Sequence, residues 1–586
     1  VMVLIMRGRI GAACASLLIL QCSICPGWRQ ATAARLISSV PVSCGTITLA
    51  IEIMQEYFRN YRPLLMGNQW MVTADHPLAV QAAGSILDEG GDAVEALVLA
   101  NLVMAVVNPH MCGLGGDLFA LVYRAESRQL RALDAAGYAP GQASLDRFAE
   151  MGLQMIPATG IHTCTVPGAL AGWQALLDDY GSLGLDTLIG RVIGYAWDGF
   201  PAYPALLGSI VKKRKLLAAS QTAASIFLAG GQPPKIGRLI RQPALAKSLA
   251  LIADQGPVTF YRGVLGEELV RHSDELGGFF SPEDLADYRV IWKEPLTAAY
   301  RGFTLATQPP PSQGLALLLQ ARILDQIDVS ALPPGSADLV HLMVEAKKQA
   351  FAERDDHICD PGFHSVPLDA LLGSRKTLEL RDRITALAGE QPCRHRFARG
   401  GEDTVYMMAV DAGGNAAVLI QSIFQEFGSC VMVPRTGMLL HNRGRGFSLN
   451  PNHPCRLEPR KRPYHTLHPL MVLEGDQPCL LLGTPGGDGQ TQTNMQLLVN
   501  LIDFDADVQG AVDAPRWRSM PDGELLLENR FPETTLHRLS GKGHNLQQLP
   551  DFSPLMGSAQ AIRIDRQQRL LAGGADGRRM AYGLGR

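Results

Sequence analysis

The stretch GGEDTVYMMAVDAGGNAAVLIQS, from residue 400 onward, constrains the fold more than any other part of the chain. Two apolar runs, 405–410 and 416–420, flank a turn that contains Gly413 and Gly414. Runs that are apolar at successive positions are typical of strands in a sheet covered on both faces. The glycines suit the positive φ angles of a tight turn. The sequence therefore predicts a buried β-hairpin with the hydroxyl of Thr404 at its head.

Other motifs occur along the chain in a fixed order: HPLAVQAAGSILDEGGDAVEA, GLGGDLF, TVPGALAGW, SPEDLADYRV, EPLTAAYRG, PPPSQG, KRPYHTLHP, GTPGGDGQ and DAPRW. With the hairpin, they make the chain from about Met66 to the C-terminus resemble the gamma-glutamyltranspeptidases, or glutathione hydrolases. These enzymes are N-terminal-nucleophile hydrolases. The resemblance implies an α+β fold of four layers, αββα, in which two antiparallel sheets lie between helical layers.

The resemblance also implies how the chain is divided. Residues 1–53 would be an N-terminal extension, residues 54–403 a large subunit and residues 404–586 a small catalytic subunit. The chain would cleave itself between Asp403 and Thr404. Both pieces would contribute to one core, so we expect them to remain associated.

Cleavage would change the chemistry of Thr404. An internal threonine hydroxyl barely ionises at neutral pH and needs a base to become a nucleophile. A free α-amine on the same residue titrates near ~8 and can take the hydroxyl proton at physiological pH. The resemblance therefore predicts that an acyl group forms an ester with Thr404 and passes to water or an amine.

Three further residues match parts of the family's catalytic site. Gly486 and Gly487 match paired glycines whose backbone amides form the oxyanion hole. The alternative is a simple turn after an apolar run at 480–482. Ser422 matches a threonine whose hydroxyl bonds to the nucleophile.

Several contacts to a glutamyl group do not carry over. The arginine that binds the α-carboxylate in the family is Ala136 here, and an alanine cannot pair with a carboxylate. The family's amine-binding aspartate aligns with Gly446, and its serine pair aligns with His465 and Thr466. The chain is therefore closer to the glutathione hydrolase-like and cephalosporin-acylase-like branch.

These departures point to a glutaryl-like or γ-glutamyl-like amide as the small-molecule substrate. Arg443 aligns with a family glutamine, and either Arg443 or Arg445 could bind a distal carboxylate; the alternative is a surface arginine in a Gly-rich loop. With His465 and Thr466, Arg443 completes the predicted substrate-binding residues. Two other functions stay open: a true glutathione hydrolase or gamma-glutamyltransferase, and an uncleaved, inactive binding relative.

Composition excludes several classes of function. A net charge of −3 with 19% charged residues gives no basic footprint, so we expect no nucleic-acid partner. Eleven cysteines show no CxxC pair beyond Cys22 and Cys25, and His465 and His468 lack a third ligand at metal-binding spacing. We expect neither a metal nor a cofactor. A GxSxG nucleophile elbow is also absent from the sequence.

The first residues allow two interpretations. Residues 6–33 resemble a secretory signal, with Arg7 and Arg9 before an apolar core and Ala-Thr-Ala at 31–33. Alternatively, residues 1–53 are translated from a wrong start. The first predicts a periplasmic or secreted protein and the second a cytoplasmic one, so localisation stays open. No integral membrane segment is expected, because the apolar run at 96–107 is interrupted by a polar residue.

Overall fold

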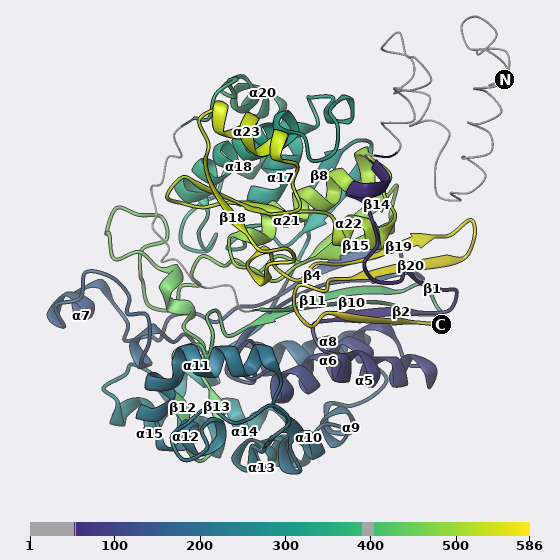
Figure 1. Ribbon diagram of the computed structural model, residues 1–586. Helices are drawn as coiled ribbons and strands as arrows, with labels where there is room; N and C mark the ends of the chain where they lie inside the picture. Colours follow the sequence, from purple (N-terminus) through teal and green to yellow (C-terminus); the bar gives the residue numbers. More distant parts are fainter. Residues whose placement is uncertain (1–51, 53, 390–403) are drawn as a thin grey trace, which may run out of the picture.

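Two seven-stranded sheets lie face to face, and helices cover the outer face of each (Figure 1). The computed structural model describes residue 52 and residues 54–389 and 404–586. The four-layer αββα architecture predicted for the chain is confirmed. The predictions for the segment 1–51 and for Asp403 lie outside the described residues.

The first sheet contains the predicted hairpin. Its strands, in spatial order, are β21 (Tyr582–Gly585), β2 (Met71–Ala74), β10 (Val405–Val410), β11 (Ala416–Ser422), β3 (Asp117–Arg124), β4 (Gln129–Ala135) and β7 (Ile291–Lys293). β10 and β11 are antiparallel, with Val405 opposite Gln421. One detail of the prediction is wrong: of the two turn glycines, only Gly414 has a positive φ, of 80°.

The second sheet carries the loop expected to form the oxyanion hole. In spatial order it comprises β1 (Leu65–Gly67), β20 (Leu570–Ala575), β19 (Gln560–Asp565), β15 (Gln477–Gly483), β14 (Leu470–Glu474), β9 (Phe303–Thr307) and β8 (Leu296–Tyr300). The segments before and after residue 404 both supply strands to each sheet. This interleaving is what one shared core requires.

The hairpin strands alternate between two apolar layers. Val405 and Met407 pack toward the helices, whereas Tyr406 and Met408 pack between the sheets with residues of the second sheet such as Leu481. Burying each such side chain contributes about 1.5–3 kcal/mol. Because side chains alternate along a strand, Thr404 continues the row of Tyr406, between the sheets.

Each outer face has its own helical layer. The first sheet is covered by α5 (Pro77–Asp88), α6 (Ala93–Val107) and α8 (Ala169–Tyr180), and the second by α17 (Gly314–Leu324), α18 (Ala337–His357), α21 (Gly489–Leu498) and α22 (Val508–Asp513) (Figure 1). α6 begins with a capping box, in which Asp92 and Glu95 each accept a backbone amide of the other.

The remaining helices lie around this frame. They are α7 (Leu145–Glu150), α9 (Leu185–Gly190), α10 (Ile193–Trp197), α11 (Pro204–Ala219), α12 (Gln221–Phe227), α13 (Pro243–Gln255), α14 (Val258–Tyr261), α15 (Val264–Glu275), α16 (Pro282–Ala286), α19 (Leu368–Leu372), α20 (Ser374–Asp382) and α23 (Glu533–Gly541). Three small sheets pair β5 (Phe200–Pro201) with β6 (Leu239–Ile240), β12 (Met432–Val433) with β13 (Met438–Leu439), and β17 (Glu524–Glu528) with β16 (Trp517–Ser519) and β18 (Asn545–Leu549).

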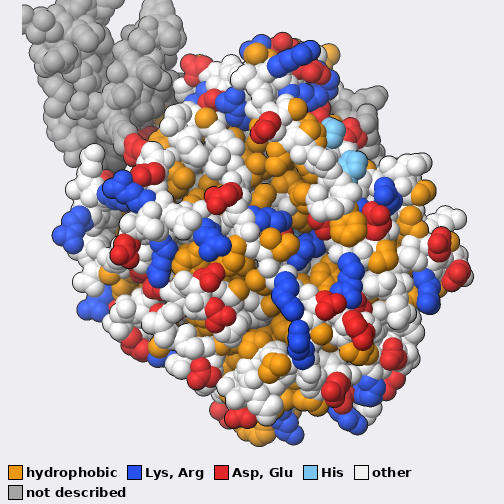
Figure 2. Space-filling view, turned by 180° about the vertical axis from the view of Figure 1, so that it is seen from behind, with side chains coloured by type: hydrophobic (Ala, Val, Ile, Leu, Met, Phe, Trp, Pro, Cys, Tyr) orange, Lys and Arg blue, Asp and Glu red, His pale blue; other side chains and the backbone are white. Residues whose placement is uncertain are grey.

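The surface carries charges of both signs. On the face shown in Figure 2, basic and acidic side chains are interspersed with apolar ones. Among the residues that the structure describes, no helix combines the length and apolar character needed to cross a membrane.

Candidate active site

Thr404 lies buried at the head of β10, with 2% of its surface exposed. The register of the hairpin places it next to Ser422 at the end of β11, and its Oγ1 donates to Ser422 Oγ at 3.2 Å. Ser422 Oγ also accepts the amide of Phe424 at 2.7 Å. The structure therefore brings together the two hydroxyls that the sequence paired.

The paired glycines follow β15 and precede α21. Gly486 and Gly487 have φ angles of 136° and 54°, which an L side chain rarely adopts, so glycine suits both positions. Tyr406, two residues after Thr404 and on the same side of the strand, donates its hydroxyl to Leu482 O at 2.9 Å. This contact ties the start of β10 to the end of β15, just before the glycine loop. The role of Gly486 and Gly487 as an oxyanion hole stays a prediction.

Gln313 holds the glycine loop from the other side. Its Nε2 donates to Gly487 O at 2.9 Å and to Thr466 O at 2.6 Å. Its Oε1 accepts the hydroxyl of Tyr464 at 3.0 Å. Arg354, which is buried, donates to Asp488 at 2.9 Å beside the loop. Gln313 lies in the motif PPPSQG, but the sequence did not reveal its contacts with Tyr464, Thr466 and Gly487, because these residues are more than 150 positions away.

A buried aspartate organises the predicted substrate-binding residues. Asp117 lies opposite Ser422 in the ladder of β3 and β11. Its Oδ2 is 2.8 Å from Arg443 Nε, 3.0 Å from His465 Nε2 and 3.4 Å from His441 Nδ1. Burial alone would raise the pKa of Asp117, but His441 and His465 outweigh it and hold the pKa well below its usual range. Burial and Arg443 lower the pKa of His465 to about 4.

Asp117 and His441 were not identified from the sequence. They lie in GLGGDLF and in the loop after β13, and only the fold brings these segments together. The Gly-rich part of the first motif permits that approach: a Cβ at Gly115 would overlap Leu439 O, and one at Gly116 would lie 2.6 Å from Ser422 O. Close backbone packing is therefore the role of these glycines.

Arg443 is a buried residue, so the surface-arginine alternative is wrong. Its guanidinium lies 4.3 Å from the centre of the Phe424 ring, and its Nη1 is 3.5 Å from Thr466 Oγ1. Its Nη2 has no hydrogen-bond partner among residues 54–389 and 404–586. A buried donor without a partner is costly, so this nitrogen is suited to receive a ligand. Arg445, by contrast, is partly exposed.

The position of the missing family arginine is closed. Ala136 is fully buried, and its carbonyl accepts the Tyr288 hydroxyl and Arg462 Nε, each at 3.1 Å. Gly446 is equally tight, because a Cβ there would overlap Tyr464 O. Neither position therefore offers a side chain that could pair with the α-carboxylate or the amine of a glutamyl group.

His465 and His468 contact different groups. His468 Nε2 bonds to Asn494 Nδ2 at 3.0 Å, whereas His465 faces Asp117. Elsewhere in the described chain, His341, Glu345 and His544 are close enough to hold a metal ion. The two rings already bond to each other at 2.9 Å, and Glu345 pairs with Lys348 at 2.7 Å. The absence of a metal stays a prediction.

The chain matches known proteins over most of its length. The family model described as gamma-glutamyltranspeptidase matches residues 79–585. The glutathione hydrolase-like YwrD proenzyme of Bacillus subtilis is 39% identical over 88% of this chain and 98% of its own length. The oxamate amidohydrolase proenzyme of Klebsiella pneumoniae is 38% identical over 87% and 97%, respectively.

A solved structure shares the whole architecture. The cephalosporin acylase from Bacillus halodurans superposes with a TM-score of 0.84 at 32% identity, covering 94% of this chain and 98% of that one. The relatives named as proenzymes fit the expectation that a precursor is processed. The chain belongs to the gamma-glutamyltranspeptidase family of N-terminal-nucleophile hydrolases, the family that its motifs predicted.

Proposed function

We propose that this protein is an amidohydrolase and acyltransferase that matures by cleavage between Asp403 and Thr404. The observation that carries the proposal is the Thr404–Ser422 hydrogen bond of 3.2 Å at the head of a fully buried hairpin. The Thr404 hydroxyl has few orientations, because the β-branched side chain restricts χ1 and the hydrogen bond to Ser422 restricts it further.

The reaction would follow from the free amine of Thr404. The amine takes the hydroxyl proton as Thr404 Oγ1 attacks the substrate carbonyl, whose π electrons move to oxygen. The amides of Gly486 and Gly487 would stabilise this oxyanion. The proton then passes to the departing nitrogen, the amide C–N bond breaks, and an acyl ester remains on Thr404. Water or an amine releases the acyl group in a second addition and elimination.

The substrate would carry a carboxylate at a distance from the amide. The unpaired Nη2 of Arg443 supports this proposal, since a guanidinium binds carboxylates strongly. Asp117 fixes the other side of the guanidinium, and Phe424 covers one face. A glutaryl-like amide fits better than a γ-glutamyl one because the usual amine and α-carboxylate contacts are absent at Ala136 and Gly446. Named relatives that act on oxamate and on cephalosporins fit a branch with varied acyl groups.

N-terminal sequencing and mass spectrometry of the purified protein test the cleavage. We expect wild type to give two pieces, one of which begins at Thr404, and Thr404→Ala to remain one inactive chain. Thr436→Ala is a matched control, because Thr436 is also buried and its hydroxyl bonds locally to Val433 O. This control should be cleaved normally. An uncut wild type that hydrolyses amides would refute the proposal, and an uncut, inactive wild type would favour a binding relative.

A further inference from the structure

A buried carboxylate outside the predicted site lies beside the strand that begins with Thr404. Asp75 directly follows β2, is 4% exposed, and accepts the amide of Tyr406 on Oδ2 at 2.7 Å. Its other oxygen, Oδ1, has no hydrogen-bond partner within the described ranges. A buried carboxylate oxygen left in this way requires an explanation.

The geometry of the strand directs the nitrogen of Thr404 toward the same edge. Alternate amides along a β-strand point to the same neighbouring strand. The Tyr406 amide points toward β2 and meets Asp75. The nitrogen of Thr404, two residues earlier, therefore points to this side as well. Cleavage would turn that nitrogen into an amine with protons to donate.

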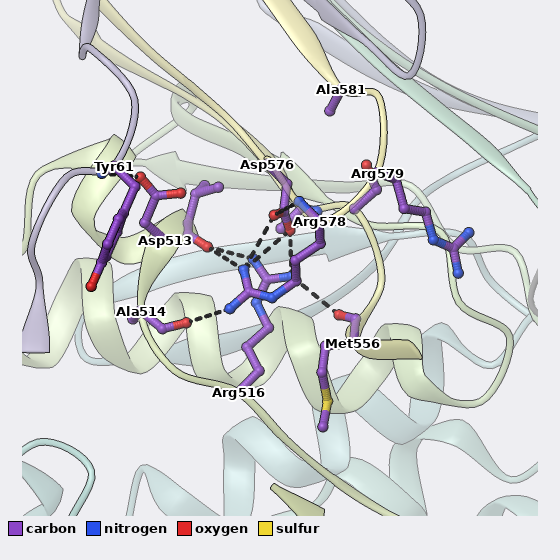
Figure 3. Close-up of polar contacts among 12 residues, drawn as sticks. Tyr61, Asp513, Ala514, Arg516, Met556, Asp576, Arg578, Arg579 and Ala581 are labelled. Carbon is purple, nitrogen blue, oxygen red and sulfur yellow. Dashed lines mark hydrogen bonds and ion pairs between the residues drawn. The ribbon is translucent and has the colours of Figure 1, made fainter. Parts of the chain in front are cut away.

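The loop at 556–559 connects the surroundings of Asp75 to the glycine loop. Ser558 lies beside the Asp75 carboxylate, and its amide donates to Thr484 Oγ1 at 3.0 Å, two residues before Gly486. The loop is held by Arg516, which donates to Met556 O at 3.1 Å and to Asp576 at 2.6 Å (Figure 3).

We propose that Asp75 binds the α-amino group of Thr404 after cleavage and is a further catalytic residue of this enzyme. The inference rests on the proposed cleavage. Asp75 Oδ1 accepts one N–H of the amine, which directs the nitrogen lone pair toward Thr404 Oγ1. When the hydroxyl proton moves to the amine, the carboxylate stabilises the ammonium ion that forms. The same proton then leaves with the amide nitrogen, so Asp75 gains and loses none.

In the uncleaved chain the surroundings of Asp75 disfavour its charge, and a donating amine beside it would favour the carboxylate form. Burial raises the pKa of Asp75 to about 7, against the Tyr406 amide and Ser558, which lower it. The charged neighbours largely oppose each other, because Arg579 lowers the pKa and Asp576 raises it. In Figure 3 the Arg579 side chain points away from the Arg516–Asp576 cluster.

Three titratable side chains near Asp75 are buried with it. Burial, reinforced by the nearby carboxylate, raises the pKa values of Cys112 and Tyr203, and burial lowers that of His76 to about 4. All three side chains are therefore uncharged near pH 7.

A crystal structure of the cleaved wild-type enzyme tests the contact directly. We expect the Thr404 nitrogen within about 3.2 Å of Asp75 Oδ1, which is hydrogen-bonding distance. A cleaved enzyme in which the nitrogen binds another group, with Asp75 turned away, would overturn the inference while leaving the proposed function intact.

Kinetics of Asp75→Asn test the role. We expect cleavage at Thr404 to proceed, KM to change little and kcat to fall about 100-fold, within the range of acid–base contributions. A carboxylate raises the pKa of an adjacent amine, so its removal lowers that pKa. Because the free amine is the active base, the acidic limb of the kcat/KM profile should move to lower pH. A purely structural residue would not move it.

Asp411→Asn is the matched control. Asp411 is a buried carboxylate at the far end of β10 that accepts the amides of Ala93 and Asn415. The Asp411→Asn enzyme should be less stable than wild type, but the acidic limb of its kcat/KM profile should not move. An Asp75→Asn enzyme that is cut and has an unchanged pH profile would overturn the inference. So would a folded Asp75→Asn chain that stays uncut, because Asp75 would then act before the amine exists.

Discussion

Gln313 Nε2 lies 2.9 Å from the carbonyl oxygen of Gly487, and the two residues fall on opposite sides of the predicted cut. Gln313 precedes α17, whereas Gly487 belongs to the loop before α21. The same nitrogen binds Thr466 O. The segment before the predicted cut thus holds the loop that we expect to bind the oxyanion.

Gln313→Leu should therefore impair the chemical step more than substrate binding. We expect kcat to fall about 10- to 100-fold with little change in KM, since an oxyanion hole at this loop would act only when charge develops on the carbonyl oxygen. Steady-state kinetics of the cleaved enzyme check this. Gln320→Leu is the control, because Gln320 is buried in α17 and its side chain bonds, among the described residues, only to Ala316 O. Equal losses in the two variants would contradict a specific role for Gln313.

Arg443→Lys tests the carboxylate site. Lysine keeps the charge but lacks the planar fork, so KM for a glutaryl anilide should rise at least 10-fold, about 1.4 kcal/mol. Activity on an acyl anilide without a carboxylate should change less. The partly exposed Arg445→Lys should leave both substrates unaffected. In wild type, a large preference for the γ-glutamyl over the glutaryl anilide would contradict the substrate proposal.

The buried pair Arg516–Asp576 should make the free energy of unfolding fall at low pH (Figure 3). Burial alone would raise the pKa of Asp576, but Arg516 and Arg578 outweigh it and lower the pKa. The stabilisation is therefore complete above the unfolded pKa of about 3.9 and is lost as the pH falls through the lower folded value.

Asp576→Asn should lower the free energy of unfolding at pH 7 by about 3–5 kcal/mol, because two arginines lose a buried partner. Urea denaturation at several pH values measures this. The difference from wild type should shrink below about pH 4. Asp476→Asn, which removes the exposed pair with Arg128, should cost less than about 1 kcal/mol. A difference that stays constant into strong acid would exclude Asp576 as its source.

Gly483→Ala should disturb the junction between the sheets. A Cβ at this position would overlap the Tyr406 ring, whose hydroxyl bonds to Leu482 O and to the Leu470 amide. Such overpacking costs about 1–3 kcal/mol, and it should also slow cleavage at Thr404 by shifting β10. Thermal unfolding and gel analysis check both effects. Gly541→Ala, at an open position in α23, should be neutral or stabilising.

The sequence predicted those parts of the fold and site that depend on local order. The hairpin and the pairing of Thr404 with Ser422 follow from residues close together in the chain or from a family motif. The sequence alone could not show that Arg443 is buried, because its partner Asp117 lies 326 residues away. Gln313 and Asp75 were missed for the same physical reason: ordinary polar residues acquire a role only when distant strands meet.

The interleaved strands have a consequence for how the mature enzyme could be made. β10 and β11 pair with β2 on one side and β3 on the other, and in the second sheet β20, β19, β15 and β14 lie between β1 and β9. Cleavage before Thr404 would leave two polypeptides whose strands are hydrogen-bonded to each other in both sheets. These polypeptides could dissociate only by global unfolding. Subunits of different molecules should consequently not exchange under native conditions, so the two pieces of each enzyme should always come from the same precursor chain.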